Sequence, residues 1–277
     1  MTSPSQVPVR FPSGISTDYQ WGPLAMYAQP NPFMYQTVFD DFLGTLAGDE
    51  NASAYTTGTG ATVTQVAGDG GQLLFTTSST GAGTAGIRGP ANNYYLPPAL
   101  YTGTGLTATL YPSKKVFFAT RINVTTIAGT TLYAGLMPQG TTTALPTDGI
   151  FFAASASAIV LEAYSASTQQ WSLAIPATLA GGGYANATWI DLAFYMDRLQ
   201  NVYAFAGFPL FGWQPQSAWT GVNNVNATPG PLGAVAAYQT SVSGAWTPTT
   251  AGLTYAMLAT GTQQTVYTDF IFAAKER

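Results

Sequence analysis

Residues 188–213 read TWIDLAFYMDRLQNVYAFAGFPLFGW, and this stretch decides the fold because two apolar runs flank one short polar break. Every second side chain of the first run is large and apolar: Ile190, Leu192, Phe194 and Met196. This period of two predicts a β-strand with one buried face and with Phe194 in the core. The break at 197–201 has the length of a hairpin loop, and residues 202–206 resume with strand-forming residues. The stretch therefore predicts a β-hairpin that carries no evident chemistry.

The composition predicts a folded chain with an uncharged polar surface. The chain has 277 residues, of which 46% are hydrophobic, 13% aromatic and only 7% charged. Disordered chains have the opposite balance, and an all-β sandwich of this length commonly forms one unit. The net charge is -4 and there are only 8 Lys and Arg residues, so no basic stripe is available to neutralise phosphates. We expect no nucleic acid partner.

Two residue types are absent, and each absence excludes a class of chemistry. Without cysteine there is no disulfide and no thiolate metal site, and without histidine the commonest general base and transition-metal ligand are missing. The N-terminus has no signal-peptide pattern, and no run of about 18 apolar residues occurs. We expect a protein made in the cytoplasm that has no membrane partner and no cofactor.

Residues 1–36 are predicted to form an extended arm. Six prolines interrupt any regular element there: Pro4, Pro8, Pro12, Pro23, Pro30 and Pro32. The arm also carries large apolar side chains that are costly to leave in water, among them Phe11, Trp21, Leu24, Met26, Tyr27 and Phe33. These side chains are predicted to lie on the body of the chain, on a neighbouring subunit or on another protein.

Residues 37–277 are predicted to form one body of short strands separated by Gly, Thr, Asn and Asp. The expected strands are 38–43, 62–67, 72–77, 115–124, 131–137, 149–153, 159–164, 171–175, the two of the hairpin, 233–240, 253–259 and 265–274. These thirteen short strands without a credible helix predict an all-β, antiparallel two-sheet jelly-roll sandwich. Strands 38–43 and 265–274 should be neighbours in one sheet, with Asp41 near Asp269. Residues 88–112 and 214–231 are expected to be long ordered loops.

The segment GAGTAG at 81–86 matches the G-x-G-x-x-G pattern of dinucleotide-binding sites. That motif works only where a strand leads into a helix whose N-terminal amides hold the pyrophosphate. Here Ile87, Arg88, Gly89 and Pro90 follow, and no helix can begin that way. The segment is predicted to be a flexible loop.

The carboxylates of the chain could in principle serve glycoside hydrolysis or cation binding. A glycosidase needs two carboxylates about 5 to 10 Å apart, yet no predicted strand presents two of the three glutamates, Glu50, Glu162 and Glu276, on one face. Four aspartates could converge on Ca²⁺, which takes oxygen ligands: Asp40, Asp41, Asp148 and Asp269. Strand-end aspartates more often satisfy turn amides, so we predict no metal site and no catalytic residues.

Several aromatic residues lie in predicted loops, namely Tyr94, Tyr95, Tyr101, Trp213, Trp219 and Trp246. Exposed Tyr and Trp are typical both of protein interfaces and of sugar stacking. Because they are spread over several loops, a subunit interface is the favoured interpretation. The predicted interface therefore combines Tyr94, Tyr95, Trp213 and Trp219 with the six apolar arm residues.

The order of these pieces resembles a family of tailed-bacteriophage virion proteins, the capsid decoration or cement proteins. The matching stretches are FPSG at 11–14, GPLAMY at 22–27, NP at 31–32, FDDF at 39–42, DGIFF at 148–152, the Trp189 hairpin and YTDFI at 267–271. The resemblance implies a concanavalin A-like or laminin G-like jelly roll. It gives no support to an enzyme, because the paired glutamates and the histidine of sugar-cutting relatives of the fold are missing.

The resemblance further implies a structural protein on the capsid surface of the virion. Its expected partners are the major capsid protein and other copies of itself, as a homo-oligomer and in particular a trimer, which clamps adjacent capsomers. The alternative is a tail or fibre component that binds a host-surface glycan through the aromatic loops.

Overall fold

The computed structural model describes the strands and the turns closest to them. The described residues are 35–42, 53–66, 71–80, 83–89, 115–125, 131–138, 146–155, 158–175, 189–196, 201–207, 229–230, 233–234, 238–241, 253–261 and 263–276. All regular elements among them are β-strands. None of these residues belongs to a helix long and apolar enough to cross a bilayer.

The described strands are numbered in chain order. They are β1 Tyr35–Asp40, β2 Ser53–Thr57, β3 Thr62–Val66, β4 Gln72–Thr76, β5 Gly83–Arg88, β6 Val116–Val124, β7 Thr131–Pro138, β8 Gly149–Ala154, β9 Ile159–Ser165, β10 Thr168–Ile175, β11 Trp189–Met196, β12 Asn201–Gly207, β13 Pro229–Gly230, β14 Gly233–Ala234, β15 Tyr238–Ser241, β16 Leu253–Gly261 and β17 Thr265–Glu276.

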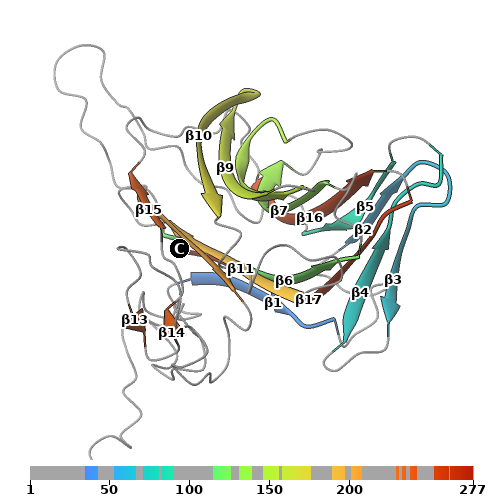
Figure 1. The fold of residues 1–277 in the computed structure, drawn as a ribbon, viewed down its shortest axis with the longest axis horizontal. Helices are drawn as coiled ribbons and strands as arrows, with labels where there is room; N and C mark the ends of the chain where they lie inside the picture. Colours follow the sequence, from blue (N-terminus) through green and yellow to red (C-terminus); the bar gives the residue numbers. More distant parts are fainter. Residues whose placement is uncertain are drawn as a thin grey trace, which may run out of the picture.

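Two antiparallel sheets lie face to face, which confirms the predicted sandwich (Figure 1). The first sheet has the order β15-β12-β11-β6-β17-β4-β3, and β1 also pairs with β17. The second sheet has the order β10-β9-β8-β7-β16-β5-β2. Strands β7, β8, β9 and β10 follow one another in the chain as a meander, whereas β17 joins β1, β4 and β6 from distant parts of the sequence. The short pair β13 and β14 forms a separate two-stranded sheet.

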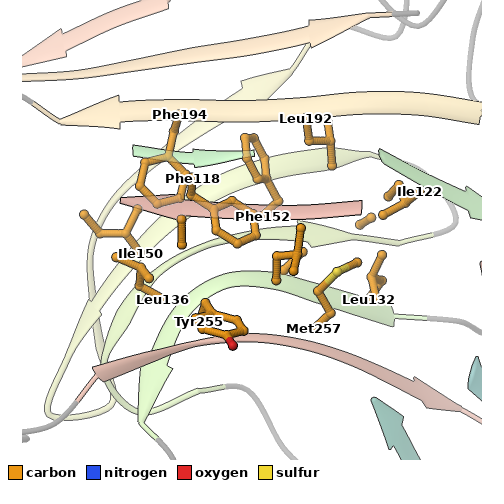
Figure 2. Packing of buried hydrophobic residues seen from close by; sticks show 14 of the residues in the cluster. Phe118, Ile122, Leu132, Leu136, Ile150, Phe152, Leu192, Phe194, Tyr255 and Met257 are labelled. Carbon is orange, nitrogen blue, oxygen red and sulfur yellow. The ribbon is translucent and has the colours of Figure 1, made fainter. Parts of the chain in front are cut away.

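The core fills the space between the sheets and is built from alternate residues of every central strand. The hairpin of β11 and β12 is present as predicted, with Met196 opposite Val202. All four alternating apolar residues of β11 belong to the core cluster, and Phe194 is completely buried. Its ring stacks on Phe118 of the neighbouring β6 at 5.5 Å between centroids and reaches Phe152 of the opposite sheet at 6.0 Å. Figure 2 shows these rings above Tyr255 and Met257, which come from β16.

The prediction of a flexible loop at 81–86 is wrong for the described part of that segment. Residues 83–88 form β5, which lies between β16 and β2 in the second sheet and is buried along most of its length. A Cβ added to Gly86 would lie 1.9 Å from the carbonyl oxygen of Met257 on β16. The glycine is therefore needed because the neighbouring backbone approaches too closely for a side chain.

Other boundaries differ from the predictions as well. Strand β2 was not expected, because SAYTT contains one aromatic residue among small polar ones. The expected strand 233–240 is divided into β14 and β15. The expected loops at 88–112 and 214–231 lie largely outside the described residues, although Arg88 ends β5 and Pro229–Gly230 forms β13.

The first and last strands of the body are neighbours, as predicted. Strand β1 pairs antiparallel with the C-terminal half of β17, from Tyr35 opposite Glu276 to Asp40 opposite Ile271. Strand β4 pairs with the N-terminal half of β17, so β1 and β4 share one side of this long strand. The last pair joins Asp40 to Ile271. Because the strands are antiparallel, Asp41 follows this pair in the direction in which β17 runs back toward Asp269. Strand β1 begins at Tyr35, and the predicted arm, residues 1–36, thus includes its first two residues.

Candidate interaction surfaces

The ten predicted interface residues all lie outside the described residues: Phe11, Trp21, Leu24, Met26, Tyr27, Phe33, Tyr94, Tyr95, Trp213 and Trp219. Their placement therefore stays a prediction. The described strands instead present two outer faces, one on each sheet, and neither follows the simple expectation of apolar residues inside and polar residues outside.

The outer face of the first sheet carries a second apolar cluster. Its buried members come from four strands and are Tyr35, Phe117, Ala119, Ala193, Tyr195 and Ala274, with Phe270 and Phe272 packed against them. The rings of Phe117 and Tyr195 lie 4.6 Å apart, and Tyr35 meets Phe117 edge-on at 5.8 Å. The exposed fraction of Tyr195 is only 5%. Strand β11 is thus buried on both faces, whereas its alternating pattern predicted one.

Arg121 on β6 joins two aspartates beside this cluster. Its Nε and Nη2 donate to Asp191 of β11 at 2.6 and 3.2 Å, and its Nη1 donates to Asp269 of β17 at 3.0 Å. The Asp191 side chain has no exposed surface. Burial alone would lower the pKa of the Arg121 guanidinium, but the hydrogen bond and charge of Asp191, followed by those of Asp269, raise it. The two-pronged geometry is the strong form of this ion pair.

A β-bulge in β17 places Asp269 on this outer face. The pairing with β6 passes from Thr268 directly to Phe270, so Asp269 is the extra residue. At the bulge, two buried hydroxyls of the core donate to backbone carbonyls. Thr120 Oγ1 donates to the Phe270 carbonyl at 2.8 Å, and Thr268 Oγ1 donates to the Arg121 carbonyl at 3.0 Å. The hydroxyls of Thr120 and Thr268 therefore help to hold the bulge in the conformation in which Asp269 contacts Arg121.

The outer face of the second sheet carries a diagonal row of three aromatic rings. Tyr133 of β7 meets Phe151 of β8 edge-on at 5.7 Å, and Phe151 stacks on Tyr164 of β9 at 5.7 Å. Phe151 is completely buried, whereas Tyr133 is only half-buried. At the far side of the same face, the guanidinium of Arg88 lies 4.6 Å from the centre of the Tyr55 ring.

Glu162 lies next to this row on β9. Its register partners are Phe151 of β8 and Ser172 of β10, and its Oε1 accepts a hydrogen bond from Gln169 Nε2 at 3.0 Å. Burial raises the pKa of Glu162, and the bond from Gln169 opposes that shift. Burial and then the charge of Glu162 raise the pKa of both Tyr133 and Tyr164. Both phenols therefore keep their protons at neutral pH and lie within the field of one carboxylate.

Three further described carboxylates accept hydrogen bonds from backbone amides. Asp40 accepts a hydrogen bond from the Phe42 amide at 2.7 Å, and Glu276 accepts one from the Lys115 amide at 3.2 Å. Asp148, which was considered as a cation ligand, accepts one from the Ala166 amide at 3.2 Å in the turn between β9 and β10. No group of three or more metal-ligating acidic side chains occurs in the described part of the chain.

Comparisons with known proteins bear on the fold. No protein-family model matches the chain, and no curated protein matches it. A protein of unknown function from Shewanella oneidensis MR-1 is similar in structure, with a TM-score of 0.55 and 10% identity over 88% of this chain and 87% of that one. Arcelin-5, a lectin-like defense protein from Phaseolus vulgaris, has a TM-score of 0.50 and 10% identity over 88% of this chain and 100% of that one.

A bacteriophage protein is also among the similar structures. The CBM2 module of the evolved Dit of Lactobacillus casei BL23 phage J-1 has a TM-score of 0.45 and 12% identity over 87% of this chain and 96% of that one. At such identities the likeness concerns the fold alone. The chain has a lectin-like, concanavalin A-like β-sandwich, as the sequence predicted.

Sequence reasoning missed both outer faces. The alternation of β11 puts Asp191 on the face opposite Phe194, but nothing in β11 alone indicates that Arg121, 70 residues earlier, binds it. A signal for the second sheet was available, because Val160, Glu162 and Tyr164 alternate with the core residues of β9. What the pattern could not provide was the register that brings Tyr133 and Phe151 beside them.

Proposed function

We propose that this chain is a bacteriophage virion structural protein that decorates the capsid, with its N-terminal arm lying on neighbouring capsid subunits. The observation that carries the proposal is the joint at the root of the arm. The arm leads directly into β1, whose six residues each pair with β17. Strand β17 is the longest described strand and pairs with β6, β4 and β1.

The geometry of this joint suits a segment under load. Hydrogen bonds of an antiparallel pair lie across the strands, so a pull along β1 loads all of its pairs with β17 together. Tyr35 adds an apolar contact to Phe117 at the same place. A passive tail does not need an attachment point that is held both by backbone pairing and by a side-chain contact.

The low charge of the chain supports contact with protein partners. Only 20 of 277 residues are charged, from 8 basic and 12 acidic ones. Fixing an extended arm costs roughly 1 kcal/mol or more per residue, and only a long apolar footprint offsets this cost. The arm has that footprint, and its prolines already restrict the free chain, which reduces the cost of binding. The partners are the major capsid protein and further copies of this chain, as a trimer, and the protein has no catalytic role.

The test is co-sedimentation with capsids that lack the protein. Because β1 begins at Tyr35, the shortened chain should begin at Met34, so that the joint with β17 is kept. We expect it to retain the β-type circular dichroism spectrum and to lose either its oligomeric mass or its binding to capsids. A full-length chain with Phe11, Trp21 and Phe33 changed to serine should fail in the same way, since it keeps the length of the arm but not its apolar anchors.

Unchanged mass together with unchanged capsid binding in the shortened chain would show that the arm is a passive tail. Binding that survives the serine substitutions but not the deletion would assign attachment to the backbone of the arm rather than to its apolar side chains.

The second candidate function is that of a tail or fibre component that binds a host-surface glycan. One observation favours it, namely the accessible Tyr133 beside Glu162 on the second sheet. This surface lies on the strands rather than on the aromatic loops. A protein of this kind would sediment with purified tails and not with empty capsids.

A further inference from the structure

The outer face of the second sheet has an accessible strip that no proposed contact of the arm uses. It runs across β7, β8, β9 and β10, where Tyr133 pairs with Ala153 and Ala153 pairs with Val160. The next residues along the strip are Glu162, Ser172 and Gln169. These side chains are half-buried or exposed, in contrast to Phe151 and Met137 beside them, which are fully buried.

The strip combines one aromatic platform with several hydrogen-bonding groups. Tyr133 has aliphatic neighbours, Ala153 and Leu258, on the two adjoining strands, and its ring lies edge-on against Phe151. Glu162 is held by Gln169 through one carboxylate oxygen, and the phenols of Tyr133 and Tyr164 keep their protons. A rigid apolar ring with a hydrogen-bonding rim suits a ligand that is apolar on one face and polar at its edge.

We propose that this strip, centred on Tyr133 and Glu162, binds a neutral carbohydrate chain. One face of a pyranose ring carries C–H groups that can rest on Tyr133, while its hydroxyls can donate to the Glu162 carboxylate and accept from the Gln169 amide. Three strand spacings separate β7 from β10, which amounts to about 14 Å and suits a short oligosaccharide. The inference deepens the second candidate function but does not depend on where in the virion the protein resides.

The chemistry of the strip disfavours other ligands. A stable protein interface buries about 800 Å² on each partner around several aromatic anchors, but Phe151 is already covered within this chain and one half-buried ring remains. A Ca²⁺ ion needs six to eight oxygen ligands, and Glu162 has no second described carboxylate beside it in a metal-binding group. An acidic glycan would be repelled by the Glu162 charge.

The experiment is native gel electrophoresis of the full chain through gels that contain a soluble polysaccharide. The probes are dextran, soluble starch, hydroxyethyl cellulose and galactomannan, with polygalacturonate as the acidic comparison. We expect retardation by at least one neutral polysaccharide and none by polygalacturonate. Tyr133→Ala should weaken the retarding interaction roughly tenfold, which corresponds to about 1.4 kcal/mol.

Tyr267→Ala is the matched control, because Tyr267 is also half-buried but lies on the first sheet. It should leave retardation unchanged, and melting curves should show that both variants fold. Absence of retardation by every neutral probe, equal loss in the two variants, or undiminished retardation of Tyr133→Ala would overturn the proposal. A Tyr133-dependent change of sedimenting mass without retardation would also overturn it, since the strip would then be a contact between copies.

The Tyr133→Ala protein should still sediment with capsids if the arm is the attachment. Failure of the carbohydrate inference and failure of the decoration proposal therefore give different results.

Discussion

The two outer faces of the sandwich differ in how their polar groups are used. On the first sheet Asp191 is completely buried and both of its oxygens are bound by Arg121. On the second sheet Glu162 is half-buried, and the Gln169 side chain that binds it is exposed. The Asp191 carboxylate thus has a structural role, whereas the Glu162 carboxylate remains in contact with solvent. One face holds the sheet and the root of the arm together, and the other is free to meet a ligand.

The aromatic residues follow the same division. Tyr195 is packed against Phe117, which also receives Tyr35 from β1. Within the described strands Tyr133 packs against one ring, that of Phe151, and stays half-buried. An outward-facing residue on a β-strand can therefore be either structural or functional, and its partners in the adjacent strands decide which.

The largest expected effect is a loss of stability on truncation of an aromatic side chain. Three positions are compared: two on opposite faces of β11 and one on the outer face of the second sheet. Phe194→Ala should lower the free energy of unfolding by about 3 to 5 kcal/mol, because it removes buried surface and leaves a cavity. Tyr195→Ala should cost less, about 2 to 3 kcal/mol, since Tyr195 is buried but lies outside the main core. Tyr133→Ala should cost about 1 kcal/mol or less. Denaturant titrations of the three variants provide the measurement.

A Tyr195→Ala protein less stable than Phe194→Ala would mean that the faces of β11 are inverted. A Tyr133→Ala protein as unstable as Tyr195→Ala would remove the distinction between the two outer faces.

The next effect concerns the ion cluster of the first sheet. Arg121→Met should cost about 3 kcal/mol, because it leaves the buried Asp191 charge without its partner. Asp269→Asn should cost less than about 1 kcal/mol, because Asp269 is partly exposed and holds Arg121 by a single bond. Thermal unfolding of both variants tests this difference. Equal losses would contradict this expectation, because the contact with Asp269 alone would then account for the whole effect of Arg121.

The smallest effect is a dependence on pH at Glu162. Burial raises its pKa in the folded state above the unfolded value of about 4.3. Between these two values the folded state binds more protons, so stability falls as pH rises through the window, and the loss is complete above the folded pKa. Glu162→Gln should therefore be more stable than the native protein at neutral pH, by less than about 1 kcal/mol because solvent screens the charge of a half-buried group. The two proteins should be equally stable below about pH 4.

Unfolding measured across this pH range separates titration from packing. A difference that persists at the acidic end would mean that the glutamine packs differently, and that the raised pKa of Glu162 is not its cause.

The sequence predicted the elements whose signals are local. The alternation in β11 placed Phe194 in the core, and the pattern at 159–164 predicted the strand that is β9. It failed at β5, where Gly86 suggested flexibility although the glycine is required by the approach of the Met257 carbonyl on another strand. That approach is a property of sheet register, which connects residues about 170 positions apart and leaves no mark in either segment alone.

The outer faces could not be predicted for the same reason. The Arg121 and Asp269 contact needs both the register of β6 with β17 and a bulge that shifts it by one residue. The strip on the second sheet needs the registers of four strands at once. Most of the predicted arm and loop residues lie outside the described strands, so the proposed decoration function rests on the joint of β1 with β17 and on the composition of the arm.

The most direct test of that function is a cryo-electron microscopy map of the virion that carries this protein. The account predicts density for a two-sheet sandwich on the outer surface of the capsid shell, with the segment that precedes Tyr35 lying across the boundary between neighbouring capsid subunits. Density confined to the tail or its fibres, with a bare shell, would contradict it.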